Sequence, residues 1–353
     1  MVEPREKRWQ LRRYYERQPE SEPEPEPERP AGGAGEQEPP ERAAVGEGAQ
    51  EPAPEAERGP LMADPIEQRR GSYLLSFGLP GSGKTTFQSF LAYYVTHIGP
   101  FEAEPVVAPE TSAQGWEPLV TFNEWMRMWG QGGFPPANPV TEGDIREMTF
   151  RVRPLRGGQG PVELSFLEVS GELMTQVVAD RVSDPAMIET LGRYLANEEI
   201  RLLLFLIVDP HRLAENDILF QNLMSYLELH YPGVRERMSL AVLVSKPEEA
   251  LRQLRERDAR YQEETVLRAE LCEAYVQRFA PRTYRILDGW PRQDRVQLMA
   301  LHLGEVVEDE QGARLREADY QDIDAIFAWI YRQLTGGRLG PPWWQRLLDW
   351  LRP

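Results

Sequence analysis

Cysteine, histidine and long apolar runs are all scarce in this chain of 353 residues. The single cysteine, Cys272, excludes an internal disulfide framework and a zinc site built on four thiolates. The longest aliphatic run, Leu202 to Val208, is far shorter than the roughly 20 residues that a membrane span needs. The stretch Met1 to Arg17 mixes charges and has no apolar core, so we do not expect it to act as a secretory signal. We therefore expect a soluble protein in the reducing cytoplasm. The histidines are scattered and show no metal-ligand spacing: His97, His211, His230 and His302.

Basic residues are also under-represented, because 40 Lys and Arg face 57 Asp and Glu for a formal charge of -17. Such an excess of acid argues against a general nucleic-acid binder, which needs a basic footprint. It does not exclude a nucleotide ligand, whose phosphates require only a few local donors.

Lysine is the rarest basic residue, with Lys7, Lys84 and Lys246 as its three occurrences. From residue 71 onward the chain has 27 arginines and only two lysines. Arginine's wide planar group does not replace a compact ammonium in a phosphate nest or a slim stem against a base. The positions of Lys84 and Lys246 therefore indicate chemistry that requires lysine.

The N-terminal 70 residues predict a disordered acidic tail. Residues 21–57 contain eleven Glu against Arg29 and Arg42, in a Glu/Pro repeat that cannot bury enough apolar area to fold. The preceding basic stretch with Trp9, Tyr14 and Tyr15 is equally consistent with a docking helix and with a frayed terminus.

Residues 71–337 predict one α/β domain with a mostly parallel central sheet and helices on both faces, because short apolar runs alternate with helical patterns. Residues 99–148 form a long insert, in which the aromatic stretch Trp116 to Trp129 favours packing over partner docking. The expected strands are 72–77, 149–155, 162–169, 201–208, 240–244 and 296–301, and the second and third form a hairpin. The expected helices are 84–97, 187–197, 213–230, 247–279 with a break near Arg260, and 323–334.

A glycine-rich segment follows the first predicted strand and opens the first predicted helix. It fits the pattern G-x-x-x-x-G-K-[ST], in which main-chain amides and the helix N-terminus bind phosphate. Lys84 can reach the β- and γ-phosphates, Thr85 can ligate Mg²⁺, and Thr86 is expected near the α-phosphate. The full segment is Gly78, Leu79, Pro80, Gly81, Ser82, Gly83, Lys84 and Thr85.

Two later segments each follow a predicted strand. The first reads Leu-Glu-Val-Ser-Gly-Glu and contains Glu168, Gly171 and Glu172; the second reads Ser-Lys-Pro-Glu from Ser245 to Glu248. Together with the glycine-rich segment they resemble the motifs of a P-loop GTPase domain of the TRAFAC type. The likeness covers roughly residues 71–335. More specifically, the chain resembles the divergent double-GTPase group of bacteria, which is encoded in multi-gene conflict or signalling systems.

The resemblance implies GTP, Mg²⁺ and switch loops, and it assigns roles to these residues. It places Glu168 on a magnesium-bound water and the amide of Gly171 at the γ-phosphate. Ser245, Lys246 and Glu248 stand where the guanine motif lies, and the loop containing His302 stands where a backbone amide touches the guanine oxygen. Glu168 and Glu248 each replace Asp and Ser245 replaces Asn or Thr, which leaves guanine selectivity open.

The resemblance also calls for a switch threonine that caps magnesium and for a group that orients water. Thr141 is the best-placed threonine, with Thr121 as its rival, and an ordinary turn or cap threonine is the alternative for both. Glu172 stands where many GTPases carry a water-orienting Gln, although a solvated helix start also explains it.

The C-terminal residues 338–353 predict a Trp-rich amphipathic segment that docks on its own domain or on a partner protein; membrane contact is less favoured because the segment is short and has few basic residues. Protein partners are expected at the switch loops, at the N-terminal arm and at this segment. Two other readings remain open: a P-loop small-molecule kinase, and an adaptor that binds nucleotide without turnover.

Overall fold

The computed structural model describes residues 66, 69–106, 118–136, 145–155, 160–169, 177–178, 181–182, 185–309 and 312–337. Within them a seven-stranded sheet has the order β2-β3-β4-β1-β7-β8-β9. Strands β4, β1, β7, β8 and β9 are parallel, whereas β3 is antiparallel to β4 and β2 to β3. The strands are β1 Gly71–Phe77, β2 Phe101–Val106, β3 Arg146–Pro154, β4 Val162–Glu168, β7 Ile200–Val208, β8 Ser239–Val244 and β9 Val296–Ala300.

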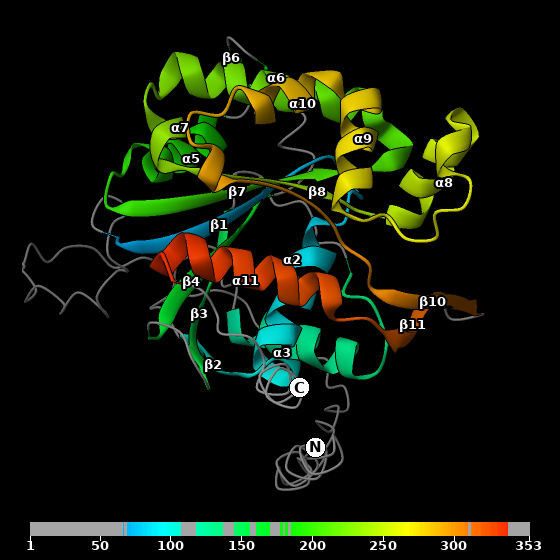
Figure 1. The fold of residues 1–353 in the computed structure, drawn as a ribbon. Coiled ribbons are helices and arrows are strands. Elements are labelled where there is room, and N and C mark those ends of the chain that lie inside the picture. The colour runs from blue at the N-terminus through cyan, green and yellow to red at the C-terminus, as the bar shows by residue number, and fades with distance from the viewer. Residues whose placement is uncertain are drawn as a thin grey trace, which may run out of the picture. The chain divides into compact units, whose positions relative to one another are not determined.

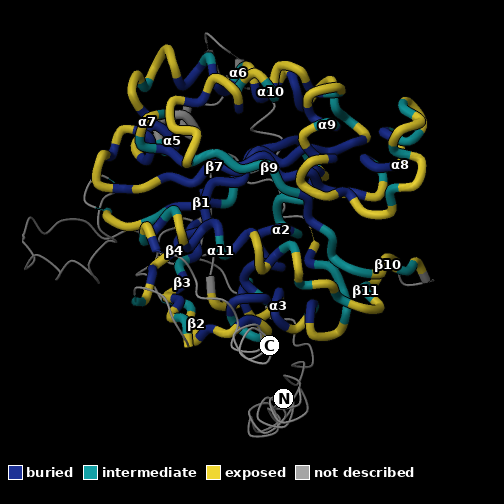
Figure 2. The backbone as a smooth tube through the Cα atoms, in the orientation of Figure 1, coloured by how far each residue is buried: buried dark blue, intermediate teal, exposed yellow. Residues whose placement is uncertain are grey.

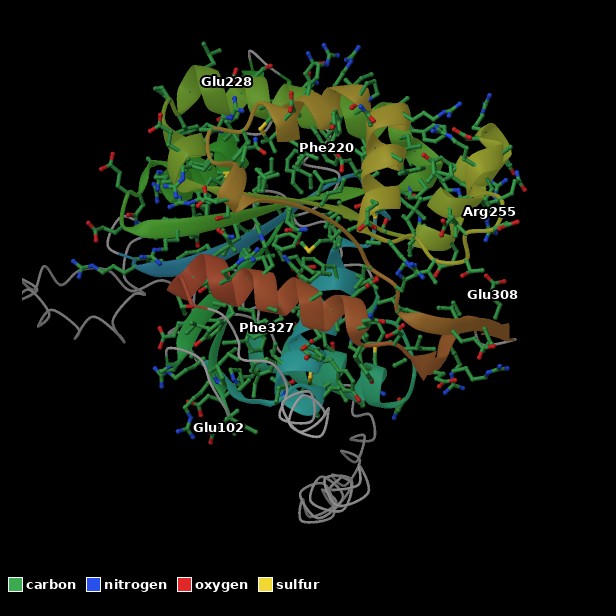
Figure 3. All side chains as sticks on the ribbon, viewed as in Figure 1. Glu102, Phe220, Glu228, Arg255, Glu308 and Phe327 are labelled. Carbon is green, nitrogen blue, oxygen red and sulfur yellow. The ribbon has the colours of Figure 1, made fainter. Side chains whose placement is uncertain are left out.

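Helices cover both faces of this sheet, as the sequence predicts (Figure 1). Alternating strand residues divide between two cores, because side chains along a strand point to opposite faces. Phe220 lies in the core on one face and Phe327 in the core on the other (Figure 3). On the first face lie α5 Pro185–Ala196, α6 Leu213–His230, α8 Pro247–Arg257, α9 Ala269–Phe279 and α10 Pro281–Asp288. On the second face lie α2 Lys84–Tyr93, α3 Pro118–Gly130 and α11 Gln321–Thr335.

The central strands β7 and β8 are buried along almost their whole length, as the tube coloured by burial shows (Figure 2). Their sequences, IRLLLFLIV and SLAVLV, are nearly continuous apolar runs. A strand covered by helices on both faces needs such a run rather than an alternating one. The expectation that residues 201–208 and 240–244 form strands of the sheet is thereby confirmed.

Several element boundaries differ from the prediction. The helix expected over 84–97 is α-helical only to Tyr93 and continues as a π-helical turn, Tyr94–Ile98. The break expected near Arg260 is longer, because α8 ends at Arg257 and α9 begins at Ala269. A short 3-10 turn, Ala259–Tyr261, lies between them.

Some elements carry no clear sequence signal. The edge strand β2 contains a proline, and the ribbon of β10 Gly304–Asp309 and β11 Gly312–Ala318 is charged and mostly exposed. Neither has the buried apolar face on which a strand prediction depends. The short helix α7 Val234–Arg237 and the small ribbon of β5 Val177–Val178 and β6 Arg181–Val182 were also unforeseen.

The insert packs on the domain rather than projecting from it. It supplies β2 and α3, and the α3 side chains Trp125, Met126 and Trp129 are buried in the core of the second face. The prediction that this aromatic stretch packs on its own domain is thereby confirmed for α3. The acidic tail up to residue 65 and the Trp-rich segment 338–353 lie outside the described residues. No helix in the described ranges is long and apolar enough to cross a membrane.

Candidate functional site

The candidate residues gather at one edge of the sheet. Because β4, β1, β7, β8 and β9 are parallel, their carboxyl ends meet at the same edge, where open α/β sheets bind ligands. The segments that leave these ends are the glycine-rich loop (residues 78–83), Val169, Asp209, Ser245 and Leu301. The three sequence motifs therefore converge although they are far apart in the chain.

The glycine-rich loop has the backbone that its glycines permit. Gly81 and Gly83 have φ angles of 74° and 93°, a region that other residues rarely adopt. A Cβ on Gly78 would lie 2.9 Å from the carbonyl oxygen of Ile207 in β7, so a side chain does not fit there. The loop is thus curved and close to the neighbouring strand, as a phosphate-cradling turn requires.

Helix α2 begins directly at the end of this loop. Its N-cap is Gly83, which has no side chain to cap the first-turn amides, and no acidic residue lies in the first turn. The first turn contains Thr85 and Thr86, both half-buried. An uncapped helix N-terminus offers amide hydrogens and positive potential to an anion.

Lys84 lies back over the loop. Its Nζ donates to the carbonyl oxygens of Gly78 at 2.9 Å and of Leu79 at 2.8 Å. Burial lowers the pKa of Lys84 to about 8, and the negative charge of Glu168 opposes part of that shift. An ammonium that is desolvated and held by neutral carbonyls is well placed to gain an anionic partner.

Thr85 and Glu168 meet beside this lysine. The Thr85 hydroxyl donates to Glu168 Oε1 at 2.9 Å, so two of the three predicted magnesium residues are in direct contact. A hydroxyl and a carboxylate are the hard oxygen groups that Mg²⁺ uses alongside water and phosphate. The donor set therefore fits a magnesium ion bound together with a polyphosphate, although the described residues contain no cluster of three metal-ligating side chains.

Ser82 and Pro80 do not present side-chain donors. The Ser82 side chain is buried, its amide donates to the carbonyl oxygen of Leu79 at 3.2 Å, and its Oγ has no hydrogen-bond partner within the described chain. Pro80 has no N–H group and offers its carbonyl oxygen, to which Arg212 Nη1 approaches within 3.4 Å. Any phosphate contact in the loop must therefore come from other main-chain amides.

Ser245 and Lys246 lie at the end of β8 against the loop. The Ser245 hydroxyl donates to the carbonyl oxygen of Val208 at 2.9 Å, and a Cβ on Gly83 would lie 3.6 Å from the Ser245 Cβ. Lys246 has a φ of 51°, the only positive value among described non-glycine residues. Its Nζ donates to Oδ2 of the buried Asp209 at 2.8 Å.

Glu248 and His302, both predicted to lie at the base, follow the carboxyl ends of β8 and β9. Glu248 is exposed in the first turn of α8, and its charge is among those that raise the pKa of His302. Burial opposes that increase, which comes mainly from the hydrogen bond and charge of Asp322. The His302 amide, expected to touch a guanine oxygen, donates to Asp322 Oδ2 at 2.9 Å.

Several predicted residues cannot be placed. Thr141, Gly171 and Glu172 lie outside the described residues. Thr121, the rival switch threonine, is half-buried in the first turn of α3.

Sequence reasoning assigned no role to Asp209 and Arg212, which follow β7. The sequence signal for Asp209 is a carboxylate that directly follows a nearly continuous apolar strand.

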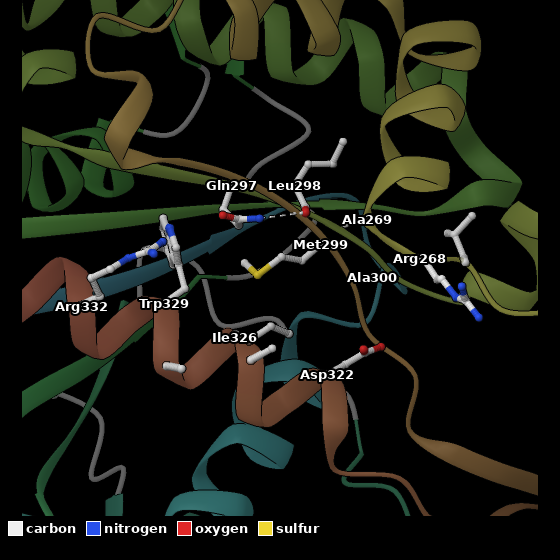
Figure 4. A pocket seen from close by; sticks show the side chains of 13 residues that line it. Arg268, Ala269, Gln297, Leu298, Met299, Ala300, Asp322, Ile326, Trp329 and Arg332 are labelled. Atoms are coloured by element: carbon white, nitrogen blue, oxygen red, sulfur yellow. Dashed lines mark hydrogen bonds between the residues drawn. The ribbon is translucent and has the colours of Figure 1, made fainter. Parts of the chain in front are cut away.

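The described part of the chain also contains a cavity of about 480 Å³ beside the edge strand β9 (Figure 4). It lies between β9, the start of α9 and one side of α11, and its lining includes Met299, Asp322 and Trp329. None of its lining residues belongs to the glycine-rich loop. The cavity therefore does not reach the loop, although Asp322 in its lining also accepts from the His302 amide.

No protein family model matches the chain, and no curated protein matches it. Among solved structures, a similar chain comes from the signal recognition particle receptor SRb-GTP/SRX complex of Chaetomium thermophilum. The two are 11% identical, and the match covers 69% of this chain and 94% of that one with a TM-score of 0.33. A likeness at that TM-score is too weak to assign a family.

Proposed function

We propose that this chain is a GTP-binding molecular switch that hydrolyses GTP slowly in a magnesium-dependent reaction. The observation that carries the proposal is the hydrogen bond between Thr85 and Glu168 beside Lys84. It brings a phosphate-binding cation and two magnesium-binding oxygens together where a helix N-terminus meets a glycine-rich turn. Few ligands other than a magnesium polyphosphate need all of these groups at one point.

The residues divide the work of binding between them. Main-chain amides of the loop and of the first turn of α2 would hold the phosphates, and Lys84 would pair with the β- and γ-phosphate oxygens. Thr85 would ligate Mg²⁺ directly and Glu168 through a water. The ion, when bound, neutralises charge that develops on the phosphates during transfer.

Guanine selectivity would come from the ends of β8 and β9. Lys246 would lay its stem along the base, Glu248 would accept from the ring N–H groups, and the main chain near His302 would approach the base oxygen. Glu248 is one methylene longer than the aspartate it replaces, so the base is expected to sit slightly farther from α8. Support comes from the position of these residues at the same sheet edge as the loop.

The switching part of the proposal rests on the sequence resemblance. Gly171 would sense the γ-phosphate, Thr141 would cap magnesium and Glu172 would orient water. Protein partners would read these loops, with the N-terminal arm and the segment 338–353 as further docking points, in a bacterial multi-protein signalling or conflict system.

A nucleotide titration on the purified full chain tests the proposal. We expect GTP to bind more tightly than ATP in the presence of Mg²⁺, and phosphate to be released slowly by the wild type but not by Lys84→Ala. Equal affinity for ATP would remove the guanine assignment. Phosphate appearing on an acceptor would establish a kinase, and release no faster than in Lys84→Ala would establish a binding adaptor.

A further inference from the structure

Arg212 lies at the boundary between the end of β7 and helix α6. It closes the 3-10 turn Pro210–Arg212 and directly precedes α6. Its guanidinium Nη1 lies 3.4 Å from the Pro80 carbonyl oxygen in the glycine-rich loop, and its Nε donates to Glu215 Oε1 at 3.1 Å. A residue 132 positions away in sequence thus brings a permanent positive charge to the loop.

Lys84 and Arg212 approach neighbouring parts of the same loop. The ammonium contacts the carbonyl oxygens of Gly78 and Leu79, and the guanidinium contacts that of Pro80, the next residue. The two cations therefore lie along three consecutive carbonyls. An anion that binds the Lys84 ammonium in place of these carbonyls therefore lies close to the Arg212 guanidinium. A rotation of the Arg212 side chain brings the two into contact.

The partner of Arg212 does not hold it firmly. Glu215 is three residues along the chain, and the Arg212 and Glu215 side chains are 37% and 57% exposed. Ion pairs that water screens to this degree contribute little to stability. The Arg212 guanidinium can therefore leave Glu215 for a phosphate with only a small loss of free energy. A phosphate accepts from a guanidinium in the same two-pronged geometry that a carboxylate uses.

We propose that Arg212 is a catalytic residue: the chain itself supplies this arginine, which stabilises the charge that develops on the terminal phosphate. The inference rests on the proposed function and deepens it. In the step concerned, a water oxygen bonds to the γ-phosphorus while the bond from that phosphorus to the β–γ bridging oxygen breaks. The bridging oxygen keeps the electron pair and leaves with the diphosphate; one water proton stays on the inorganic phosphate and the other passes to solvent. Arg212 donates to oxygens whose charge grows along this path, an interaction stronger in the transition state than in the bound triphosphate.

The test separates turnover from binding in Arg212→Ala, Arg212→Lys and Glu215→Gln. For Arg212→Ala we expect kcat for GTP to fall on the order of 10²- to 10³-fold, while the Kd for GDP changes by less than about threefold. Arg212→Lys is expected to recover only part of the loss, since an ammonium cannot make the two-pronged contact. Added guanidinium ion should restore part of the turnover of Arg212→Ala, an effect that a structural role would not produce. Glu215→Gln should keep turnover at or above the wild-type rate.

Arg292→Ala is the matched control. Arg292 pairs with Asp294 through two bonds of 3.0 and 2.9 Å, just before the amino end of β9 and thus at the opposite edge of the sheet from the site. It should change neither kcat nor Kd.

Unchanged turnover in Arg212→Ala, with wild-type binding and hydrolysis intact, would overturn this inference alone. A loss in Glu215→Gln equal to that in Arg212→Ala would also overturn it, because the ion pair would then be supporting the loop. A wild-type chain that binds GTP without hydrolysing it would remove the catalytic role, and one that binds no nucleotide would remove the proposed function as well.

Discussion

The Thr85 hydroxyl donates to Glu168 Oε1 at 2.9 Å, across 83 residues of sequence. The contact follows from the sheet, because β1 and β4 are parallel neighbours with Leu75 opposite Leu167. The residue that ends β4 therefore reaches the helix that begins after β1. A local pattern at residues 78–85 and a single acid far along the chain become one group of oxygens through this pairing.

Magnesium dependence of nucleotide binding is the first consequence. In the wild type we expect removal of Mg²⁺ by a chelator to weaken GTP binding. In Glu168→Gln, which removes a charge that supports the ion through a water, we expect affinity for Mg²⁺ to fall by ~10- to 100-fold. In Thr85→Ala, which removes a direct ligand, we expect a loss at least as large. Titration of Mg²⁺ at a fixed GTP concentration measures this. Thr149→Ala, which removes a hydroxyl bonded to Ser165 elsewhere on the sheet, is the control. Equal magnesium curves for all variants would contradict the assignment of Thr85 and Glu168.

Lys84→Ala should abolish triphosphate binding and leave the fold intact. Burial already opposes the charge of Lys84 in the folded protein, so its removal relieves a desolvation penalty. A ligand at about 100 times its Kd stabilises a folded protein by about 2.7 kcal/mol, which thermal unfolding detects. The wild type should therefore melt at a higher temperature with GTP and Mg²⁺, whereas the variant should melt at the same temperature with and without them. An equal ligand-induced rise in both proteins would contradict the role of Lys84.

The depressed pKa of Lys84, about 8, predicts a pH dependence of binding. Phosphate contact requires the ammonium, so below pH 8 the ligand-free protein already carries the needed proton. Above pH 8 binding must first take up a proton, and affinity should fall by up to about tenfold per pH unit. Stability of the ligand-free protein moves the other way: the folded pKa lies below the unfolded 10.5, so the penalty of burying the charge is relieved as pH rises from 8. Calorimetry in buffers of different ionisation enthalpy should detect proton uptake at pH 9 and none of this origin at pH 7. A pH-independent Kd would contradict the prediction.

The sequence predicts the sheet and the loop well because both depend on local chemistry. A buried parallel strand needs a continuous apolar run, and β7 and β8 have one. A tight anion-binding turn needs glycines at positive φ, and Gly81 and Gly83 supply them. These requirements act within a few residues, so a single sequence displays them.

The contacts between side chains that come from distant elements escape such reasoning. Asp209 pairs with Lys246 because β7 and β8 are neighbours in the sheet, and Asp322 contacts the amide and ring of His302 because α11 packs beside the end of β9. Nothing near residue 322 in the sequence indicates a partner 20 residues earlier, since the ribbon of β10 and β11 intervenes. The charged ribbon itself was missed because it buries no apolar face.

A largely buried ion pair between Arg69 and Glu147 predicts a strong effect on stability. Glu147 in β3 is 7% exposed, forms an ion pair with Arg69 and accepts from the Tyr194 hydroxyl at 2.8 Å. Glu147→Ala would leave the Arg69 guanidinium, whose side chain is only 13% exposed, without this charge, which should lower the free energy of unfolding by about 3–5 kcal/mol. Urea unfolding measures the change. The control is Glu163→Ala, which removes the half-exposed partner of Arg151 and should change the free energy of unfolding far less. Equal losses of unfolding free energy in the two variants would show that the Glu147 ion pair contributes no more to stability than an exposed one.

Asp209→Asn should reduce the preference for guanine while leaving phosphate binding intact. Lys246 holds a left-handed backbone conformation that costs a non-glycine residue roughly 1–2 kcal/mol, and the 2.8 Å ion pair with Asp209 helps to fix its side chain there. Asparagine keeps the shape but not the charge, and Lys246, whose side chain is 42% exposed, can then turn toward solvent. We expect GTP affinity to fall by about tenfold, corresponding to about 1.4 kcal/mol, and affinity for inorganic tripolyphosphate to stay unchanged. Competition of both ligands against a fluorescent GTP analogue measures the two affinities on one protein. A parallel loss of both would show that Asp209 supports the glycine-rich loop rather than the base position, and an unchanged GTP affinity would show that the ion pair does not position Lys246.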